Sequence, residues 1–232
     1  MRHILAILGS AFLLTSCDET TPPGGPTGDL IVLTASQATA LVDRFEQLSS
    51  SDPILGSLAD TIRFVITAGA EVQRIDATTN FGADSYYVVS LHRTFSGTSQ
   101  SWSTFHVIGF NDPSNPTEFL ILGGWSQTSG STPPTSVSGS IGASGNTSLT
   151  GHFFSASGTN VNMWHADAGT VSLNASATAE SCPGFSAPGM TCVKSDMSVT
   201  FAITGTVPEN GATGERTGSG TASSVPGVRL SM

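Results

Sequence analysis

Positive charge is scarce in this chain of 232 residues. Lysine and arginine together number 8, against 17 aspartates and glutamates, and Lys194 is the only lysine. The formal net charge is −9 at pH 7. Nucleic-acid binding depends on clustered lysine and arginine, so we expect no nucleic-acid partner. Electrostatic adhesion to anionic lipid is disfavoured for the same reason.

Catalytic sequence patterns are missing as well. The chain has no Gly-Lys-Ser/Thr phosphate loop, no G-x-S-x-G turn, no H-E-x-x-H pair and no D-x-D-x-D-G calcium loop. Each of these patterns places reactive or ligating groups at a spacing that its chemistry requires. We therefore rank a non-catalytic role above an enzymatic one and expect no cofactor.

The longest apolar run, residues 4–14, is too short to span a bilayer, which needs about 20 apolar residues. It follows Arg2 and His3 and precedes a polar, proline-rich stretch, as in a secretory signal peptide. The run ends in Leu14-Thr15-Ser16-Cys17, which resembles the lipobox of bacterial lipoproteins. The resemblance implies cleavage before Cys17 and acylation of its thiol, with palmitate among the chains added.

This interpretation divides the chain into three parts. Residues 1–16 are the expected signal peptide, residues 17–29 the lipidated cysteine and a flexible tether, and residues 30–232 one domain. The implied partner is a lipid bilayer, at the inner or outer membrane of a cell envelope, facing the periplasm or the exterior. The alternatives are an ordinary secretory peptide with an incidental cysteine, and an uncleaved signal anchor.

Two further cysteines, Cys182 and Cys192, flank a stretch rich in proline and glycine. Such a stretch can bring its ends together, and an exported protein meets an oxidising compartment. We expect a disulfide between them. The alternative is a metal or redox pair, but the spacing differs from C-x-x-C and no histidine lies between the two.

Hydrophobic periodicity predicts a mainly β fold with a short N-terminal α-helical hairpin. Apolar residues recur at helical spacing in residues 34–49 and again between Asp52 and Gly69. Thr34 and Gln37 suit a capping box. Short alternating segments then follow at regular intervals and predict an antiparallel β-sandwich or barrel. The expected strands are residues 71–77, 85–95, 102–110, 118–125, 137–141, 147–154, 161–165, 170–177, 197–204 and 217–222.

Histidine is the first candidate for a metal site. His92 and His106 lie on neighbouring predicted strands and would face one another if both pointed to the same side. They remain weak candidates, because a catalytic zinc site normally has three protein ligands and a structural site four. His165 with Asp167 would contribute only if the fold brought them in. The alternative, which we prefer, is that these are ordinary histidines in or beside strands.

Aromatic residues make up only 7% of the chain, so its tryptophans and tyrosines are candidates for a binding surface. Tyr86, Trp102 and Trp164 would stack on a sugar or close over a lipid tail if they lined one face. The alternative, and our preference, is that they pack in the core.

Three functions remain after these observations. The first is a membrane-anchored envelope lipoprotein that acts as a non-catalytic binding or interaction module, with an envelope protein or a small apolar ligand as its partner. The second is a β-barrel carrier of a small apolar ligand or lipid, which requires a continuous apolar cavity. The third is an envelope hydrolase in which histidines converge with a carboxylate.

Overall fold

The computed structural model describes residues 28–50, 53–80, 82–182, 184–185, 187–209 and 213–232. The predicted signal peptide, Cys17 and the tether up to residue 27 lie outside the described residues. Within the described part, neither helix is long and apolar enough to cross a membrane.

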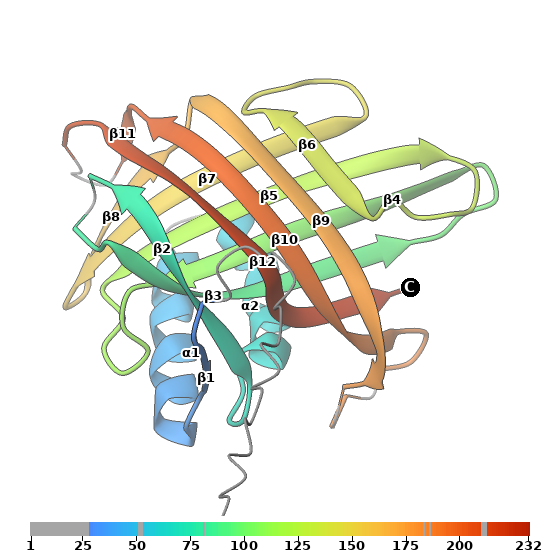
Figure 1. Cartoon of the computed structure of the whole chain (residues 1–232), viewed down its shortest axis with the longest axis horizontal. Helices are drawn as coiled ribbons and strands as arrows, with labels where there is room; N and C mark the ends of the chain where they lie inside the picture. The colour runs from blue at the N-terminus through green and yellow to red at the C-terminus, as the bar shows by residue number, and fades with distance from the viewer. Residues whose placement is uncertain (1–27, 51–52, 81, 183, 186, 210–212) are drawn as a thin grey trace, which may run out of the picture.

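The fold is mostly antiparallel β-structure with a helical hairpin near its N-terminal end, which confirms the predicted fold class (Figure 1). One sheet of 12 strands runs in the order β11-β8-β7-β5-β4-β3-β2-β12-β10-β9-β6, with β1 paired to β2, and it does not close. The helices are α1 (Ala35–Ser49) and α2 (Pro53–Val65). The strands are β1 (Leu30–Val32), β2 (Glu71–Thr79), β3 (Ser85–Phe95), β4 (Gln100–Phe110), β5 (Glu118–Ser129), β6 (Ser136–Ser140), β7 (Thr147–Ser157), β8 (Asn160–His165), β9 (Ala168–Ser181), β10 (Thr191–Gly205), β11 (Val207–Glu209) and β12 (Arg216–Ser231).

The helical hairpin begins at the predicted capping box. The Thr34 hydroxyl accepts from the Gln37 backbone N–H at 3.3 Å, and the Gln37 amide oxygen accepts from the Thr34 N–H at 2.9 Å. The second helix ends at Val65, earlier than the predicted stop at Gly69. Gly69 serves a turn instead, with φ of 85° and its N–H donating to the Leu33 carbonyl oxygen.

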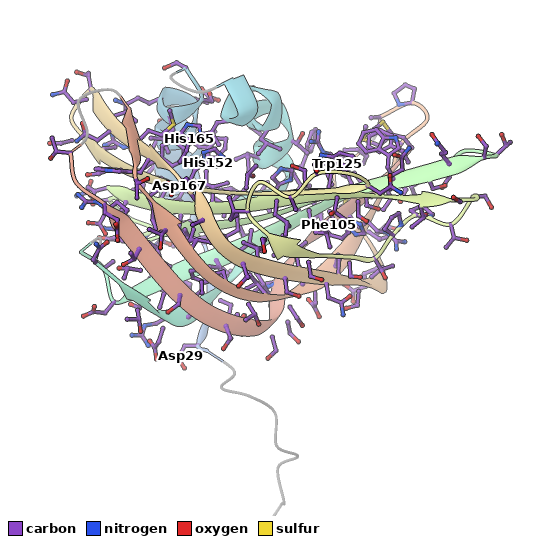
Figure 2. The ribbon with its side chains drawn as sticks, turned by 90° about the horizontal axis from the view of Figure 1, so that it is seen from above. Asp29, Phe105, Trp125, His152, His165 and Asp167 are labelled. Carbon is purple, nitrogen blue, oxygen red and sulfur yellow. A yellow bond between two sulfur atoms is a disulfide. The ribbon has the colours of Figure 1, made fainter. Side chains whose placement is uncertain are left out.

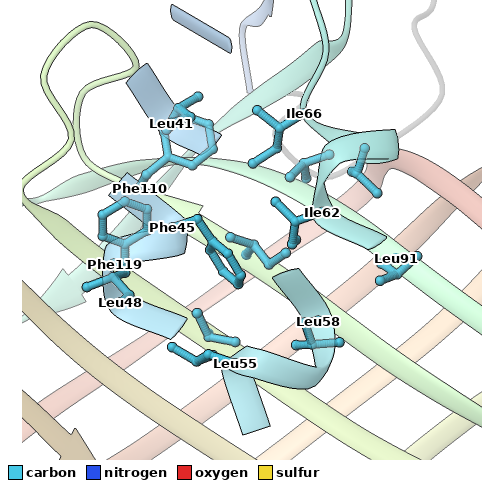
Figure 3. Close-up of a cluster of buried hydrophobic side chains, with 14 of the residues drawn as sticks. Leu41, Phe45, Leu48, Leu55, Leu58, Ile62, Ile66, Leu91, Phe110 and Phe119 are labelled. Carbon is cyan, nitrogen blue, oxygen red and sulfur yellow. The ribbon is translucent and has the colours of Figure 1, made fainter. Parts of the chain in front are cut away.

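The hairpin packs its apolar side onto one face of the sheet, forming a helix-side core (Figure 3). Both helices bury residues at helical spacing, and the sheet contributes apolar residues from β3, β4, β5, β7 and β8. The main participants are Leu41, Phe45, Leu48, Leu55, Leu58, Ile62, Leu91, Phe110 and Phe119. From α1, the side chains of Arg44 and Gln47 donate to the Gly158 carbonyl oxygen in the β7–β8 turn.

The opposite face of the same strands forms an inner core. In β5, Phe119 and Ile121 belong to the helix-side core, whereas Leu120 and Leu122 belong to the inner core. This division follows from the alternation of side chains along a strand, and it explains why residues 119–122 are apolar without interruption.

The two halves of the sheet face one another across the inner core. A Cβ atom at Gly151 in β7 would lie 2.8 Å from Ile203 Cδ1 in β10, and one at Gly218 in β12 would lie 3.2 Å from the Phe153 ring in β7. The space between the halves is therefore filled by side chains. Both cores are built from described residues between Ile31 and Leu230.

Strand β12 turns the corner between the halves by changing partners. Residues 218–220 pair antiparallel with β2, whereas residues 227–231 pair in parallel with β3. Between them, Ser224 has φ of 61°, a left-handed conformation that is uncommon outside glycine. A Cβ atom at Gly227 would lie 1.9 Å from the Ser90 carbonyl oxygen, so the close approach of β12 to β3 requires glycine there.

Cys182 and Cys192 lie at disulfide distance, with Cα atoms 5.4 Å apart. Cys192 is buried in the helix-side core, and the loop that it closes reaches α2. There the Phe185 ring meets the Phe64 ring edge to face at a centroid distance of 4.9 Å. The cysteine pair therefore ties the end of β9 to the start of β10 beside the helical hairpin.

Candidate binding surface

Three aromatic side chains form a patch on the sheet, which we call the aromatic platform: the exposed Trp102 and Trp125 and the half-buried Phe95. They lie on the face that carries the helices, because Trp125 shares the alternation of Phe119 and Ile121 along β5. Figure 2 shows Trp125 on this side of the sheet, beside the helical hairpin. Trp102 is 39% exposed and Trp125 is 37% exposed.

Strand register brings the platform together. Phe95 at the end of β3 pairs with Trp102 in β4, and Thr104 in β4 pairs with Trp125 in β5. Trp102 and Trp125 are therefore diagonal neighbours, a relation that places residues about 7–8 Å apart on one face. The Phe95 and Trp102 rings stack at a centroid distance of 3.8 Å with an interplanar angle of 11°. This stacking fixes the orientation of the Trp102 indole.

Amide and hydroxyl groups surround the platform. Gln127, opposite Trp102, donates from Nε2 to the Gln100 Oε1 at 2.9 Å. Arg93 donates from Nε to the Thr104 hydroxyl oxygen at 3.1 Å, and partial burial lowers the pKa of its guanidinium. The surface thus combines aromatic rings with neutral hydrogen-bonding groups and one cation.

The structure does not bring Tyr86, Trp102 and Trp164 onto one face. Tyr86 and Trp164 are buried in the inner core, where burial raises the pKa of the Tyr86 hydroxyl. Trp164 donates from Nε1 to the Gly214 carbonyl oxygen at 3.1 Å, and the Arg216 guanidinium lies 4.3 Å from its ring centroid. Of the three, only Trp102 is exposed.

Sequence reasoning missed the partners of Trp102. Phe95 ends one predicted strand and Trp102 begins the next, with only a short serine- and glycine-containing connection between them. Pairing these strands as a hairpin would have placed the two rings opposite one another. Trp125 gives no such local signal, because its face depends on the register between β4 and β5.

His92 and His106 point to opposite faces of the sheet. His92 pairs with Phe105 and Leu91 with His106, so the two histidines are one position out of step. His92 stacks on Phe105 in the inner half at 4.5 Å, where burial and then Arg229 lower its pKa to about 4. His106 lies on the helix side, and burial, Arg93 and His152 lower its pKa to about 3. The structure does not assemble these two as a ligand pair.

The remaining histidines meet on β7 and β8. His152 pairs with His165, and their rings contact edge to face at 4.5 Å (Figure 2). Asp167 is engaged elsewhere, since its carboxylate accepts from the hydroxyl and the N–H of Thr206. Among the residues described, no group of three or more His, Cys, Asp or Glu side chains could hold a metal ion.

A groove of about 610 Å³ lies at the C-terminal end of α2, a size typical of small-molecule sites. Its walls come from α2, the start of β2, the disulfide loop and β12. Most of its side chains are apolar or small, and Glu71 and Lys194 are charged. Lys194 forms an ion pair with Glu180 at 2.8 Å.

No protein-family model, curated protein or solved structure matches this chain.

Proposed function

We propose that the protein is a lipid-anchored binding module of a bacterial cell envelope, held at a membrane through Cys17, and that the aromatic platform is its binding surface. The observation that carries the proposal is the exposure of Trp102 and Trp125 side by side on one face of the sheet. The chain has only three tryptophans, and these are two of them.

Two neighbouring exposed indoles are typical of a surface that binds a partner. A tryptophan is among the largest apolar side chains, and clustered exposed apolar groups mark binding surfaces more often than isolated ones do. Both indoles are held on strands whose backbones are hydrogen bonded on each side. The Trp102 indole also stacks on Phe95, so a ligand would meet that ring already oriented, which reduces the entropy lost on binding.

The anchoring segment suits presentation of this surface. Asp29, close to the start of the described chain, lies on the opposite side of the sheet from Trp125 (Figure 2). The 12 residues from Asp18 to Asp29 would span at most about 40 Å when extended. Acylation of the lipoprotein type supplies several chains, and two or more chains anchor a protein stably. The platform lies on the side away from the point where the tether would join the domain, so a ligand could reach it while the protein is anchored.

The two alternative functions draw less support from the described residues. A carrier needs an apolar cavity between the halves of the sheet, and that space is occupied by side chains such as Phe153 and Ile203. A hydrolase needs histidines and a carboxylate in one cleft, whereas His92 and His106 point to opposite faces and Asp167 binds Thr206.

Two experiments test the proposal. In cells supplied with a fatty-acid analogue, the wild-type chain should be labelled and the Cys17→Ser variant should not; persistent labelling of that variant refutes the anchor. For the binding role, a lipid-free form of residues 18–232 is mixed with washed envelope fragments and sedimented. This form keeps every described core contact.

The wild-type domain should sediment with the fragments, and the Trp102→Ala/Trp125→Ala variant should stay in solution. Leu30→Ser is the matched control, because Leu30 is an apolar residue of β1 that is 58% exposed away from the platform. Equal sedimentation of wild type and the double variant would refute the binding role of the platform.

A further inference from the structure

We propose that the ligand of the aromatic platform is an uncharged glycan chain, bound through the faces of its pyranose rings. This inference rests on the proposed binding role and adds the chemical class of the ligand. Three observations carry it: the geometry of the rings, the chemistry of the groups around them, and the absence of charge in the neighbouring loops.

The ring geometry suits a flat ligand with C–H bonds on its faces. Trp102 and Trp125 are diagonal neighbours on one sheet face, so they offer two successive contact points and not one enclosed pocket. The face of an indole is electron-rich and attracts weakly positive C–H bonds, which a pyranose ring presents on its faces. Two indoles one diagonal step apart would contact successive parts of an extended chain of rings.

The polar neighbours suit hydroxyl groups. The hydrogen bond between Gln127 and Gln100 uses one Nε2 proton and one Oε1 lone pair, and leaves the Gln100 amide protons and the Gln127 oxygen for a ligand. Thr104 accepts from Arg93, so its own hydroxyl proton can be donated. Alternating donors and acceptors beside ring faces are what a sugar, with hydroxyls at its edge, can satisfy.

The loops at this end of the sheet carry no charge. The connections β3–β4, β5–β6 and β6–β7 comprise residues 96–99, 130–135 and 141–146, and they contain only Ser, Thr, Gly, Pro, Ala, Ile and Asn. The β3–β4 and β5–β6 connections are linked by the Gly130 N–H, which donates to the Ser99 carbonyl oxygen at 2.9 Å. In the β6–β7 connection, the Asn146 backbone carbonyl oxygen accepts from the Gln127 N–H at 2.9 Å. Of the charged side chains that the structure describes, Arg93 lies beside the platform through its hydrogen bond to Thr104, and it offers an ionic ligand a single partner.

Other occupants fit these observations less well. A bilayer bound by the platform would have to approach the face opposite Asp29 (Figure 2). The proposed tether to Cys17 joins the domain at Asp29, on the other side. A symmetric dimer through the platform would bring the exposed Gln100 and half-buried Gln127 amides against the same amides of the second copy. The core of a protein–protein interface favours apolar side chains over such amides.

The test is a fluorescence titration of residues 18–232 with the hexasaccharides of N-acetylglucosamine and of glucose. At least one should change the emission of the exposed tryptophans and bind saturably. Trp102→Ala and Trp125→Ala should each weaken binding by between about threefold and tenfold, as loss of one aromatic contact implies. Trp102→Phe should retain most of the affinity, and Leu30→Ser should bind like the wild type. Oligogalacturonate of the same length, which is acidic, should bind more weakly than the better neutral hexasaccharide.

The outcomes separate this inference from the proposed function. If neither neutral hexasaccharide binds, but envelope sedimentation still requires Trp102 and Trp125, the platform binds a different class of ligand and the inference fails alone. Tighter binding of oligogalacturonate also overturns it, because the ligand would then be acidic. If sedimentation is independent of both tryptophans, the proposed function fails first. The buried Trp164 reports folding of each variant through its emission.

Discussion

Lowering the pH from about 7.5 to about 5 should destabilise the protein through His92. This imidazole is 1% exposed, and burial together with Arg229 holds its pKa at about 4 in the folded protein, below the 6.5 of an exposed histidine. Between these two pKa values the unfolded chain binds a proton that the folded protein does not. Stability is therefore fully present above about pH 6.5 and falls as the pH decreases toward the folded pKa.

The size of the effect follows from the two pKa values. At about pH 5 the unfolded histidine is almost fully protonated and the folded one almost fully neutral, so His92 alone should remove about 2 kcal/mol of stability relative to about pH 7.5. His106 acts in the same direction because its pKa is also lowered. Glu118 and Asp196 act in the opposite direction, because burial raises the pKa of each carboxyl group.

A variant isolates the contribution of His92. Urea unfolding of the wild type and of His92→Phe, followed by tryptophan emission, gives the free energy of unfolding at both pH values. The substitution has a cost that is independent of pH, because phenylalanine must fit beside Phe105 and Arg229. The pH-dependent difference should nevertheless be smaller in the variant by about 2 kcal/mol. An unchanged difference would show that His92 titrates as in the unfolded chain, and would refute its burial in a site that excludes the charged form.

Two further predictions concern the fold. Replacing both Cys182 and Cys192 with alanine should lower the free energy of unfolding by about 2.8 kcal/mol, the chain-entropy value for so short a loop, and a denaturant midpoint equal to wild type would contradict the cross-link. Gly227→Ala should cost more than about 2 kcal/mol, because its Cβ would lie 1.9 Å from the Ser90 carbonyl oxygen. Gly56→Ala in α2 is the matched control of opposite sign: its Cβ has no neighbour closer than 3.6 Å, so thermal unfolding should show a gain of up to about 1 kcal/mol. A Gly227→Ala protein as stable as Gly56→Ala would contradict the parallel pairing of β12 with β3.

Local patterns in the sequence were sufficient for both helices, for most of the strands and for the fold class. The capping box at Thr34 and the apolar spacing of Leu41, Phe45 and Leu48 are properties of one helix, so they are readable without knowing its partner. The same holds for the alternation in β10, where Met197, Val199, Phe201 and Ile203 are all buried.

The site depends on information that no single segment contains. Whether His92 and His106 face one another depends on the register between β3 and β4, and a shift of one residue reverses the answer. The binding hypothesis requires Tyr86 and Trp102 on one face, but the sheet has apolar cores on both faces, so an aromatic residue can be buried on either side. Core packing, the preferred alternative, holds for Tyr86 and not for Trp102. Trp125 joins Trp102 only through the pairing of β4 with β5.

The partner change of β12 was equally hidden from sequence reasoning. The predicted strand ends at residue 222, before the serine, proline and glycine residues that separate the two halves of β12. In the structure the strand continues to Ser231, because residues 227–231 find a parallel partner in β3. A glycine at position 227 is what permits that approach, and its purpose is visible only beside Ser90.

Trp102 and Trp125 are the proposed surface through which this protein binds envelope material. The most direct measurement records the indole N–H resonances of the three tryptophans in residues 18–232 while solubilised envelope fragments are added. The Trp102 and Trp125 signals should shift or broaden saturably. The Trp164 signal should stay unchanged, because this indole is buried and its Nε1 donates a hydrogen bond to the Gly214 carbonyl oxygen. Fragments that bind the protein and leave the Trp102 and Trp125 signals in place would contradict this binding role.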